Sequence, residues 1–274
     1  MYIESLLLKA CKRLKKLSSH INLINESSVS ALARSYNVLD YPKSLINVLN
    51  ATIPGITFDT FSKLELHSII NQILTQKYKG EAALKAKLVE MFVEKKVTAA
   101  FEIKVNGSRV DFLKVNGDTV SYEIKSKIDN LSKLPKQVSD YEKVFEYNYI
   151  VIDEIHHKSA LKLIPDHYGV YVLIKNKLQQ LKPATLNTQL DSNIQLGLFT
   201  KRELEQTFKN IRPNIELIKE FYTDEEINNF FKEMLKRRYT KKWNFLIDNL
   251  AEILPIDYQF FFHHNIHPKV IYGA

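Results

Sequence analysis

The chain has 274 residues, of which 45% are hydrophobic and 26% are charged, and only 7 are glycine. This composition suffices for one large domain or two small ones with an ordinary core, and it excludes a disordered, collagen-like or low-complexity protein. The single cysteine, Cys11, excludes a disulfide framework and a thiolate zinc cluster. No apolar run is long enough to span a membrane and the N-terminus lacks the features of a signal peptide, so we expect a cytoplasmic protein without a membrane partner.

Basic residues outnumber acidic residues by 39 to 31, which gives a formal net charge of +8. The excess is spread along the chain and is not concentrated in one stretch. It favours a polyanionic partner such as nucleic acid, but it does not identify one.

The first 66 residues are expected to form short helices. Near the N-terminus, leucines at helical spacing are interleaved with basic residues, namely Lys9, Lys12, Arg13, Lys15 and Lys16. This pattern fits a helix that packs its leucines on a neighbour, and it also fits a helix that lies on a membrane or on nucleic acid. Two longer helices are predicted at residues 60–75 and 81–95.

A change from helical to strand patterns follows. Residues 98–105, 109–115 and 119–126 are predicted strands, joined at Asn106-Gly107 and at Asn116-Gly117, which are both hairpin-type turns. Residues 130–145 have helical spacing, with Pro135 in the first turn. The runs 147–153 and 169–175 suit buried strands, and the chain from residue 201 is predicted to be helical. The fold class is therefore mixed α/β, with helices covering a sheet.

The second and third predicted strands each have an apolar face and a polar face. Even-numbered positions are apolar, whereas the polar odd-numbered positions include Asp111, Glu123 and Lys125. The apolar faces of the two strands point to the same side of the sheet only if the numbers of two residues that pair with each other add up to an even value. A three-residue loop, Val115-Asn116-Gly117 with Gly117 in the left-handed conformation, meets this condition, whereas a two-residue loop does not. We therefore predict this loop, with Asp111 one diagonal step from Glu123.

Two carboxylates and a lysine on one face of a sheet have a chemical use. The carboxylates can share a hard cation such as Mg²⁺, which lowers the pKa of a bound water and neutralises charge on a phosphate. Lys125 can orient the attacking water and hold the phosphate. The alternative is a solvated strand face on which Asp111, Glu123 and Lys125 make ordinary cross-strand pairs.

The order of Asp111, then Glu123-Ile124-Lys125 one strand later, resembles the signature of the PD-(D/E)xK nuclease superfamily. The core of that superfamily is a helix, a three-strand meander, a helix and a strand, which is the order predicted here. The resemblance therefore implies a restriction-endonuclease-like α/β core with helical N- and C-terminal additions. Val110 stands where the proline of the superfamily's name would be, a position at which members vary.

The resemblance also implies roles for further residues. In recombination-type members a glutamate on the first core helix adds a metal ligand, and Glu81 has the corresponding place, while the carbonyl of Ile124 is a further ligand. Gln137 and Tyr141 match a Gln-x-x-x-Tyr pair on the following helix. Since positions i and i+4 share a helical face, these two side chains could contact the bound strand or steady Lys125. The implied cofactor is Mg²⁺ or Mn²⁺.

The stretch from residue 122 to 170 resembles a bacterial family linked to phages and mobile elements, most of whose members are uncharacterised. The likeness covers roughly residues 78–200 and does not account for residues 1–66. We therefore expect a helical accessory segment at 1–66, a nuclease core at 67–200 and a helical segment at 201–274.

Several other side chains have more than one interpretation. Glu102 is either a further metal ligand or a partner of Arg109, and Arg109 is either a phosphate contact or part of a structural ion pair. Asp129 is expected to cap the helix that carries Gln137. His156 could contact substrate, although a loop histidine is more often structural.

The C-terminal segment contains a basic cluster and three histidines. Lys236, Arg237 and Arg238, with Trp243 close by, form either a grip on a phosphate backbone or a solvated helix face. The three histidines are His263, His264 and His267. Their segment fits an aromatic packing tail better than a zinc site.

These observations predict a metal-dependent nuclease that hydrolyses phosphodiester bonds, with DNA as the favoured substrate. Two alternatives remain at this point. One is a nucleic-acid-binding protein that does not cleave. The other is a subunit of a phage-defence or mobile-element system that a protein partner controls through residues 1–66. A homodimer would suit a nuclease that cuts both strands, but no sequence feature demonstrates one.

Overall fold

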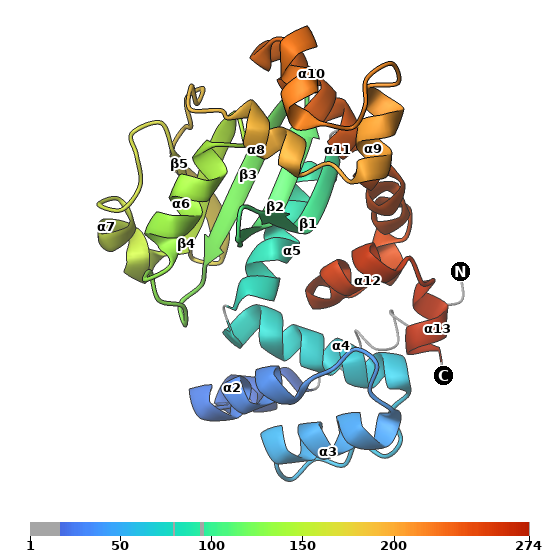
Figure 1. The fold of residues 1–274 in the computed structure, drawn as a ribbon. Coiled ribbons are helices and arrows are strands. Elements are labelled where there is room, and N and C mark those ends of the chain that lie inside the picture. The colour runs from blue at the N-terminus through green and yellow to red at the C-terminus, as the bar shows by residue number, and fades with distance from the viewer. Residues whose placement is uncertain (1–16, 79, 94–95, 274) are drawn as a thin grey trace. The chain divides into compact units, whose positions relative to one another are not determined.

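The computed structural model describes residues 17–78, 80–93 and 96–273 (Figure 1). The chain forms two compact units. One, the helical unit, comprises residues 1–88 and 245–274, and the other, the sheet unit, comprises residues 89–244. The division falls within helix α5 (Glu81–Phe92) and within helix α11 (Asp224–Asp248).

In the helical unit, described residues from Leu17 to Leu74 form an apolar core, and Ile256 from the C-terminal part of the chain packs against it. Residues 17–23 are helical, and short 3-10 turns cover Leu250–Glu252 and Pro255–Asp257. Its other helices are α2 (Glu26–Ser35), α3 (Pro42–Thr52), α4 (Lys63–Ile73), the first turns of α5, α12 (Tyr258–His264) and α13 (Pro268–Tyr272). The fully buried side chains of the core include Leu32, Leu45, Leu49, Phe58 and Ile70. The basic residues predicted on a helix near the N-terminus, from Lys9 to Lys16, lie outside the described residues.

Helix α4 shows why the helix predicted at residues 60–75 begins later than expected. The Ser62 hydroxyl accepts the Glu65 backbone N–H, and the Glu65 carboxylate accepts the Ser62 N–H at 2.8 Å. This reciprocal capping box fixes the first turn at Lys63. At its other end α4 continues as a π-helical turn, Leu74–Tyr78.

The sheet unit contains a six-stranded mixed sheet in the order β1-β2-β3-β4-β5-β6. The strands are β1 (Thr98–Val105), β2 (Ser108–Asn116), β3 (Asp118–Lys125), β4 (Tyr147–Asp153), β5 (Gly169–Ile174) and β6 (Lys177–Lys182). The first three form an antiparallel meander, and β4 runs parallel to β3. The mixed α/β class and the five predicted strands are confirmed. The edge strand β6 was not predicted.

Helices connect and flank these strands. Helix α6 (Leu134–Glu142) is the crossover between β3 and β4, and Pro135 lies in its first turn as predicted. The remaining helical segments are a 3-10 turn at Glu154–His156, α7 (His157–Ala160), α8 (Ser192–Gly197), α9 (Lys201–Thr207), α10 (Ile215–Phe221) and α11. The predicted helical C-terminal region is confirmed for the part of the chain that the structure describes.

The two faces of the sheet are covered differently (Figure 1). On one face, which we call the α6 face, Leu134 and Val138 of α6 pack with Ile150, Ile152 and Val172 of β4 and β5. On the opposite face, aromatic side chains of the central strands form a buried layer. It contains Phe101, Phe112, Tyr122, Phe92 of α5 and Trp243 of α11, with Phe112 and Trp243 ring centroids 6.0 Å apart.

The β2–β3 connection confirms the even pairing sum but corrects the loop. Phe112 pairs with Tyr122 and Asn116 with Asp118, so the turn is centred on Gly117, which has a φ of 79°. The loop therefore lies one residue later than Val115-Asn116-Gly117. This shift places Asp111 directly opposite Glu123, where we had expected a diagonal neighbour. The cause is that Val115 continues the strand by pairing with Thr119.

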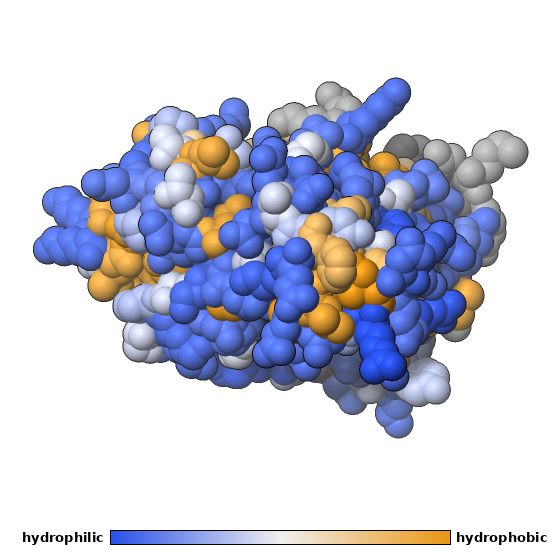
Figure 2. All heavy atoms as spheres, turned by 45° about the horizontal axis from the view of Figure 1, so that its top comes forward, coloured by the Kyte–Doolittle hydropathy of each residue, from blue (hydrophilic) through white to orange (hydrophobic). Residues whose placement is uncertain are grey.

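No described helix is both long enough and apolar enough to cross a membrane. The face drawn in Figure 2 is mostly hydrophilic, with small apolar patches that are separate from one another.

A buried polar network ties the helical unit together. The Asp257 carboxylate is 3% exposed and accepts the hydroxyls of Tyr36 at 3.1 Å and of Tyr272 at 2.7 Å. The Tyr36 oxygen also lies 2.8 Å from Nδ1 of His67. Burial raises the pKa of Asp257 to about 7, although both tyrosine hydroxyls oppose the shift, and burial lowers the pKa of His67 to about 3.

This network predicts stability that falls as the pH rises. The unfolded Asp257 loses its proton near its ordinary pKa, whereas the folded one keeps it up to about pH 7, so its contribution declines between about pH 4 and pH 7. The full loss is on the order of 4 kcal/mol. Asp257→Asn should therefore flatten the pH dependence of the urea-unfolding free energy, measured between about pH 5 and pH 8. Asp59→Asn, which changes an exposed acid of the same unit, should leave it unchanged, and equal slopes in all three proteins would contradict the assignment.

Candidate functional site

Three ionisable side chains of β2 and β3 lie together on the α6 face. Asp111, Glu123 and Lys125 are 9%, 2% and 8% exposed. A solvated strand face, the alternative that the sequence left open, therefore does not describe them. Because buried charged groups are costly unless they are paired, their contacts determine what the site can do.

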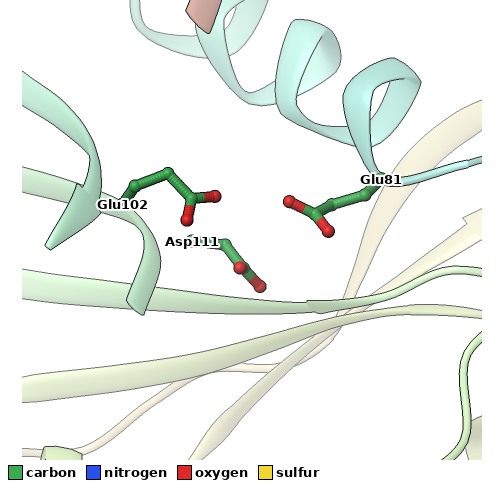
Figure 3. Close-up of side chains that lie close together, drawn as sticks. All are labelled: Glu81, Glu102 and Asp111. Carbon is green, nitrogen blue, oxygen red and sulfur yellow. The ribbon is translucent and has the colours of Figure 1, made fainter. Parts of the chain in front are cut away.

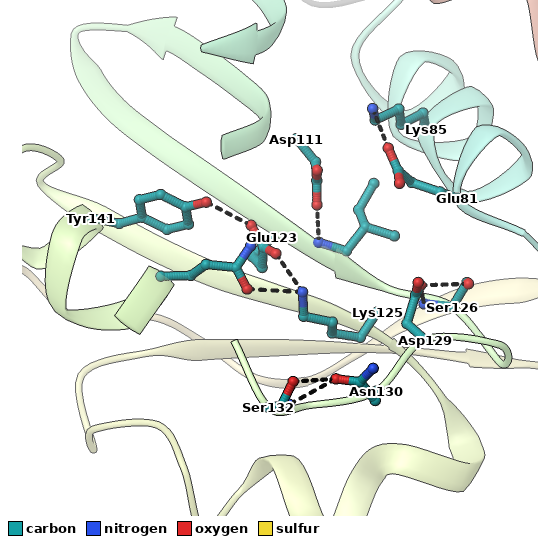
Figure 4. Close-up of polar contacts among 12 residues, drawn as sticks. Glu81, Lys85, Asp111, Glu123, Lys125, Ser126, Asp129, Asn130, Ser132 and Tyr141 are labelled. Carbon is teal, nitrogen blue, oxygen red and sulfur yellow. Dashed lines mark hydrogen bonds and ion pairs between the residues drawn. The ribbon is translucent and has the colours of Figure 1, made fainter. Parts of the chain in front are cut away.

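Glu123 is held from two sides by side chains of known position (Figure 4). Lys125 Nζ donates to Oε1 of Glu123 at 2.7 Å, and the Tyr141 hydroxyl donates to Oε2 at 2.8 Å. Burial, and then the negative charge of Glu123, raise the pKa of Tyr141, so this hydroxyl remains a proton donor. Because each oxygen accepts one hydrogen bond, the orientation of the Glu123 carboxylate is fixed.

Gln137 completes the connection between α6 and β3. Its Oε1 accepts a hydrogen bond from Lys125 Nζ at 2.9 Å. Gln137 and Tyr141 lie one helical turn apart, and in this structure they contact Lys125 and Glu123. Of the two uses expected for this pair, steadying Lys125 is the one observed for Gln137. Contact of either residue with a nucleic-acid strand stays a prediction.

Asp111 lies where the ladder between β2 and β3 ends. Beyond the Phe112–Tyr122 pair, Oδ2 of Asp111 accepts the backbone N–H of Ile124 at 2.6 Å. The side chain therefore replaces a backbone acceptor and keeps a buried N–H satisfied. Since the N–H and C=O of one strand residue point to the same neighbouring strand, the Ile124 carbonyl is directed toward the side on which Asp111 lies.

Glu102 lies on β1, the strand that pairs with β2, and it is a neighbour of Asp111 (Figure 3). Each offers a carboxylate oxygen within 4.8 Å of the other, and Glu102 has an unusual positive φ of 60°. Glu102 forms an ion pair with Arg109, as one of its two sequence interpretations predicted. The Arg109 side chain is 62% exposed, so it remains accessible at the rim of the site.

Glu81 belongs to the helical unit. It begins α5, and its carboxylate, 47% exposed, forms an ion pair one turn along the helix with the buried Lys85 (Figure 4). The described site of the sheet unit therefore contains Asp111, Glu123, Lys125, Gln137 and Tyr141. The choice between Glu81 and Glu102 as a further ligand stays a prediction.

Several other expectations need correction. Asp129 does not cap α6: its Oδ2 accepts the backbone N–H and the hydroxyl of Ser126 in the preceding turn, at 2.8 and 2.6 Å. Trp243 is 2% exposed within the aromatic layer, so it cannot stack on a bound strand there. The zinc interpretation, which the sequence did not favour, lacks its helical spacing, because α12 ends at His264 and Asn265 adopts the left-handed conformation before His267.

The basic cluster is partly engaged in structural contacts. Arg238 pairs with Glu203 and donates to the Leu198 carbonyl at 2.9 Å. Burial would raise the pKa of Glu203, but hydrogen bonds from Arg238 and Thr200 lower it to about 2. Arg237 donates to the Thr207 hydroxyl at 2.6 Å, and Lys236 pairs with Glu233 at 2.8 Å on the exposed side of α11.

Two residues of the sheet unit, His156 and Glu146, make contacts that were not predicted from the sequence. His156, weighed as a substrate contact, has Nε2 3.0 Å from the Ser126 carbonyl. Glu146 is 7% exposed and accepts the Thr119 backbone N–H at 2.7 Å, Asn228 at 2.8 Å and Lys232 at 2.9 Å. No sequence signal points to Glu146, because its partners come from distant elements.

The geometry thus defines a mixed α/β protein with a buried cluster of carboxylates and a lysine under its crossover helix. The family described as bacteriophage P4 protein cII matches residues 75–261, about two thirds of the chain. The chain belongs to this family. All of the predicted metal ligands lie within the matched stretch.

No curated protein matches the chain. One solved structure, described as a protein of unknown function, SPO1766, from Silicibacter pomeroyi, is similar at 16% identity. The match covers 39% of this chain and 73% of that one, with a TM-score of 0.31.

The contact between Tyr141 and Glu123 can be tested through stability. Tyr141→Phe removes a buried hydrogen bond to a carboxylate, so the free energy of unfolding should fall by about 1–3 kcal/mol. The matched control is Tyr168→Phe, which removes a buried bond to the neutral Val138 carbonyl and should cost about 0.5–1.5 kcal/mol. Urea unfolding measures both. A smaller loss for Tyr141→Phe than for Tyr168→Phe would contradict the assignment.

Proposed function

We propose that the chain is a metal-dependent nuclease that hydrolyses phosphodiester bonds, most favourably in DNA. The observation that carries the proposal is the position of Lys125 Nζ between Glu123 and Gln137, with Asp111 on the neighbouring strand. The element order helix, three-strand meander, helix and strand, which spans α5 to β4, supports a restriction-endonuclease-like core of the PD-(D/E)xK type. Membership in a phage protein family supports a role on mobile elements.

The donor set fits a hard divalent cation. Asp111 and Glu123 offer carboxylate oxygens, the ligand type that Mg²⁺ and Mn²⁺ prefer. Buried carboxylates on adjacent strands repel each other, and Lys125 offsets one of the two charges. A divalent cation between the two carboxylates would be attracted to both of them. The Ile124 carbonyl is a third oxygen ligand in the set that we propose for the sheet unit, and a further ligand from Glu81 or Glu102 stays a prediction.

The bound metal would supply a water of lowered pKa and neutralise charge that grows on the phosphate. The chain's own residues provide orientation. Tyr141 fixes the direction of the Glu123 carboxylate, and Gln137 fixes the Lys125 ammonium group, which can donate to the attacking water or to a phosphate oxygen. Arg109 at the rim, with Lys236 and Arg237 on α11, would contact the phosphate backbone. Arg238 would join them only by leaving Glu203.

Cleavage is the first test. We expect the purified chain to cut nucleic acid in Mg²⁺ or Mn²⁺ and not in EDTA. Lys125→Ala and Asp111→Ala should each lower the cleavage rate by on the order of 100-fold or more. Lys136→Ala, which removes an exposed lysine paired with Asp140 on the same helix, should keep the wild-type rate. Supercoiled plasmid, linear duplex, single-stranded DNA and RNA would be compared.

The outcomes separate the candidate functions. Full metal-dependent cleavage by Lys125→Ala or Asp111→Ala would falsify the proposal. Tight metal-independent binding without cleavage would favour a non-cleaving nucleic-acid-binding protein. Activity that appears only in a complex formed through residues 1–66 would favour the partner-controlled subunit.

Metal binding can be tested without activity. Millimolar Mn²⁺ should raise the melting temperature of the wild-type chain, by about 2–4 °C for each kcal/mol of binding free energy. Asp111→Asn and Glu123→Gln should abolish this shift, because each removes a charged ligand. Asp118→Asn, an exposed acid at the β2–β3 turn, should retain it. An undiminished shift in both site variants would place the metal elsewhere.

A further inference from the structure

A pocket of about 410 Å³ lies within the helical unit. Its size falls in the range of about 300–1,000 Å³ that is typical of small-molecule sites. Residues of α5, of the segment after α2 and of the chain from Pro255 to His264 line it, among them Tyr36, Lys85, Asp257, Gln259, Phe260 and His264. None of these six has a role in the proposed catalytic site.

One part of the lining is a buried carboxylate with neutral partners. Asp257 accepts only the hydroxyls of Tyr36 and Tyr272, and among the described residues no cationic side chain pairs with it. A buried carboxyl group of this kind can accept an N–H donor through its carbonyl oxygen, and while it is protonated it can also donate one hydrogen bond. The Watson–Crick edges of nucleobases present such donors.

A second part of the lining is a buried cation. Lys85 is 3% exposed, and its Nζ donates to Oε1 of Gln259 at 2.7 Å and pairs with the Glu81 carboxylate (Figure 4). A lysine ammonium group donates charge-assisted hydrogen bonds to phosphate oxygens, so Lys85 makes this wall of the pocket suited to a phosphate group.

A third part of the lining is aromatic. The rings of Phe260 and His264 lie with their centroids 4.5 Å apart, and His264 is exposed while Phe260 is half-buried. Unpaired bases stack on aromatic side chains of this kind, and every base has a π face that can do so. The acceptor, the cation and the aromatic pair therefore line one pocket.

We propose that this pocket binds one unpaired nucleotide of the substrate, with its base against Phe260 and His264, its polar edge toward Asp257 and its phosphate at Lys85. The inference rests on the proposed nuclease function and names the substrate class. That class is single-stranded or locally opened nucleic acid, and a continuous duplex does not belong to it.

The test is a binding measurement in EDTA, where no phosphodiester bond is hydrolysed. Fluorescence anisotropy would compare a labelled single-stranded oligonucleotide with its duplex. Phe260→Ala and His264→Ala should each weaken single-strand binding by roughly 5- to 100-fold, the loss expected for one stacked base, and should leave duplex binding within about two-fold. Phe221→Ala, which removes a 67% exposed ring on α10, should change neither.

A second measurement locates the contact. A single strand that carries iodouracil, cross-linked by light to the wild-type chain, should label peptides that contain residues 255–264. Lys85→Gln should weaken binding as well, and circular dichroism would show whether this buried substitution preserves the fold. Single-strand binding by both aromatic variants equal to that of Phe221→Ala, or cross-links only outside residues 255–264, would overturn the inference.

The two proposals fail in different ways. Pocket-dependent binding of single strands by a chain that cuts nothing in Mg²⁺ or Mn²⁺ would reject the nuclease and keep the pocket. Cleavage that requires Asp111 and Lys125, with single-strand binding unchanged in Phe260→Ala and His264→Ala, would reject the pocket and keep the nuclease.

Discussion

The buried carboxylate of Glu123 constrains much of the sheet unit. A carboxylate that is 2% exposed must have partners, and it has them in Lys125 of its own strand and Tyr141 of α6. These contacts fix the crossover helix in rotation as well as in place, because Gln137 must reach Lys125 from the same helical face. The apolar side chains of α6 then pack on β4 and β5 around this polar centre.

The meander brings the second carboxylate to the same place. The even pairing sum of β2 and β3 puts Asp111 opposite Glu123, and the ladder opens there so that Asp111 can accept the Ile124 N–H. Stability alone would favour apolar residues at such positions, since replacing a buried ionic group by packed hydrophobic residues is often neutral or stabilising. Local deviations from the pattern of a stable core concentrate at functional sites, and this cluster is such a deviation.

The sequence was sufficient for the parts of the fold that repeat a pattern. Alternation in β2 and β3 predicted the shared polar face, and Gly117 predicted the turn, although pairing of Val115 moved the loop by one residue. The edge strand β6 carries no such pattern, because most of its side chains are exposed. The burial of Trp243 and the pairing of Arg238 with Glu203 depend on where α11 packs, which local spacing does not specify.

The helical unit adds a constraint of a different origin. The family match spans residues 75–261 and includes Asp257, whereas its two hydroxyl donors, Tyr36 and Tyr272, lie outside that stretch. Residues outside the matched stretch therefore supply the hydroxyl groups that satisfy the buried carboxyl group of Asp257 at the wall of the pocket. The predicted catalytic residues all lie inside the match, so the chemistry and the burial of Asp257 depend on separate parts of the sequence. Changes near the termini should accordingly alter the stability of the helical unit and what its pocket accepts, while the contacts among Asp111, Glu123 and Lys125 stay intact.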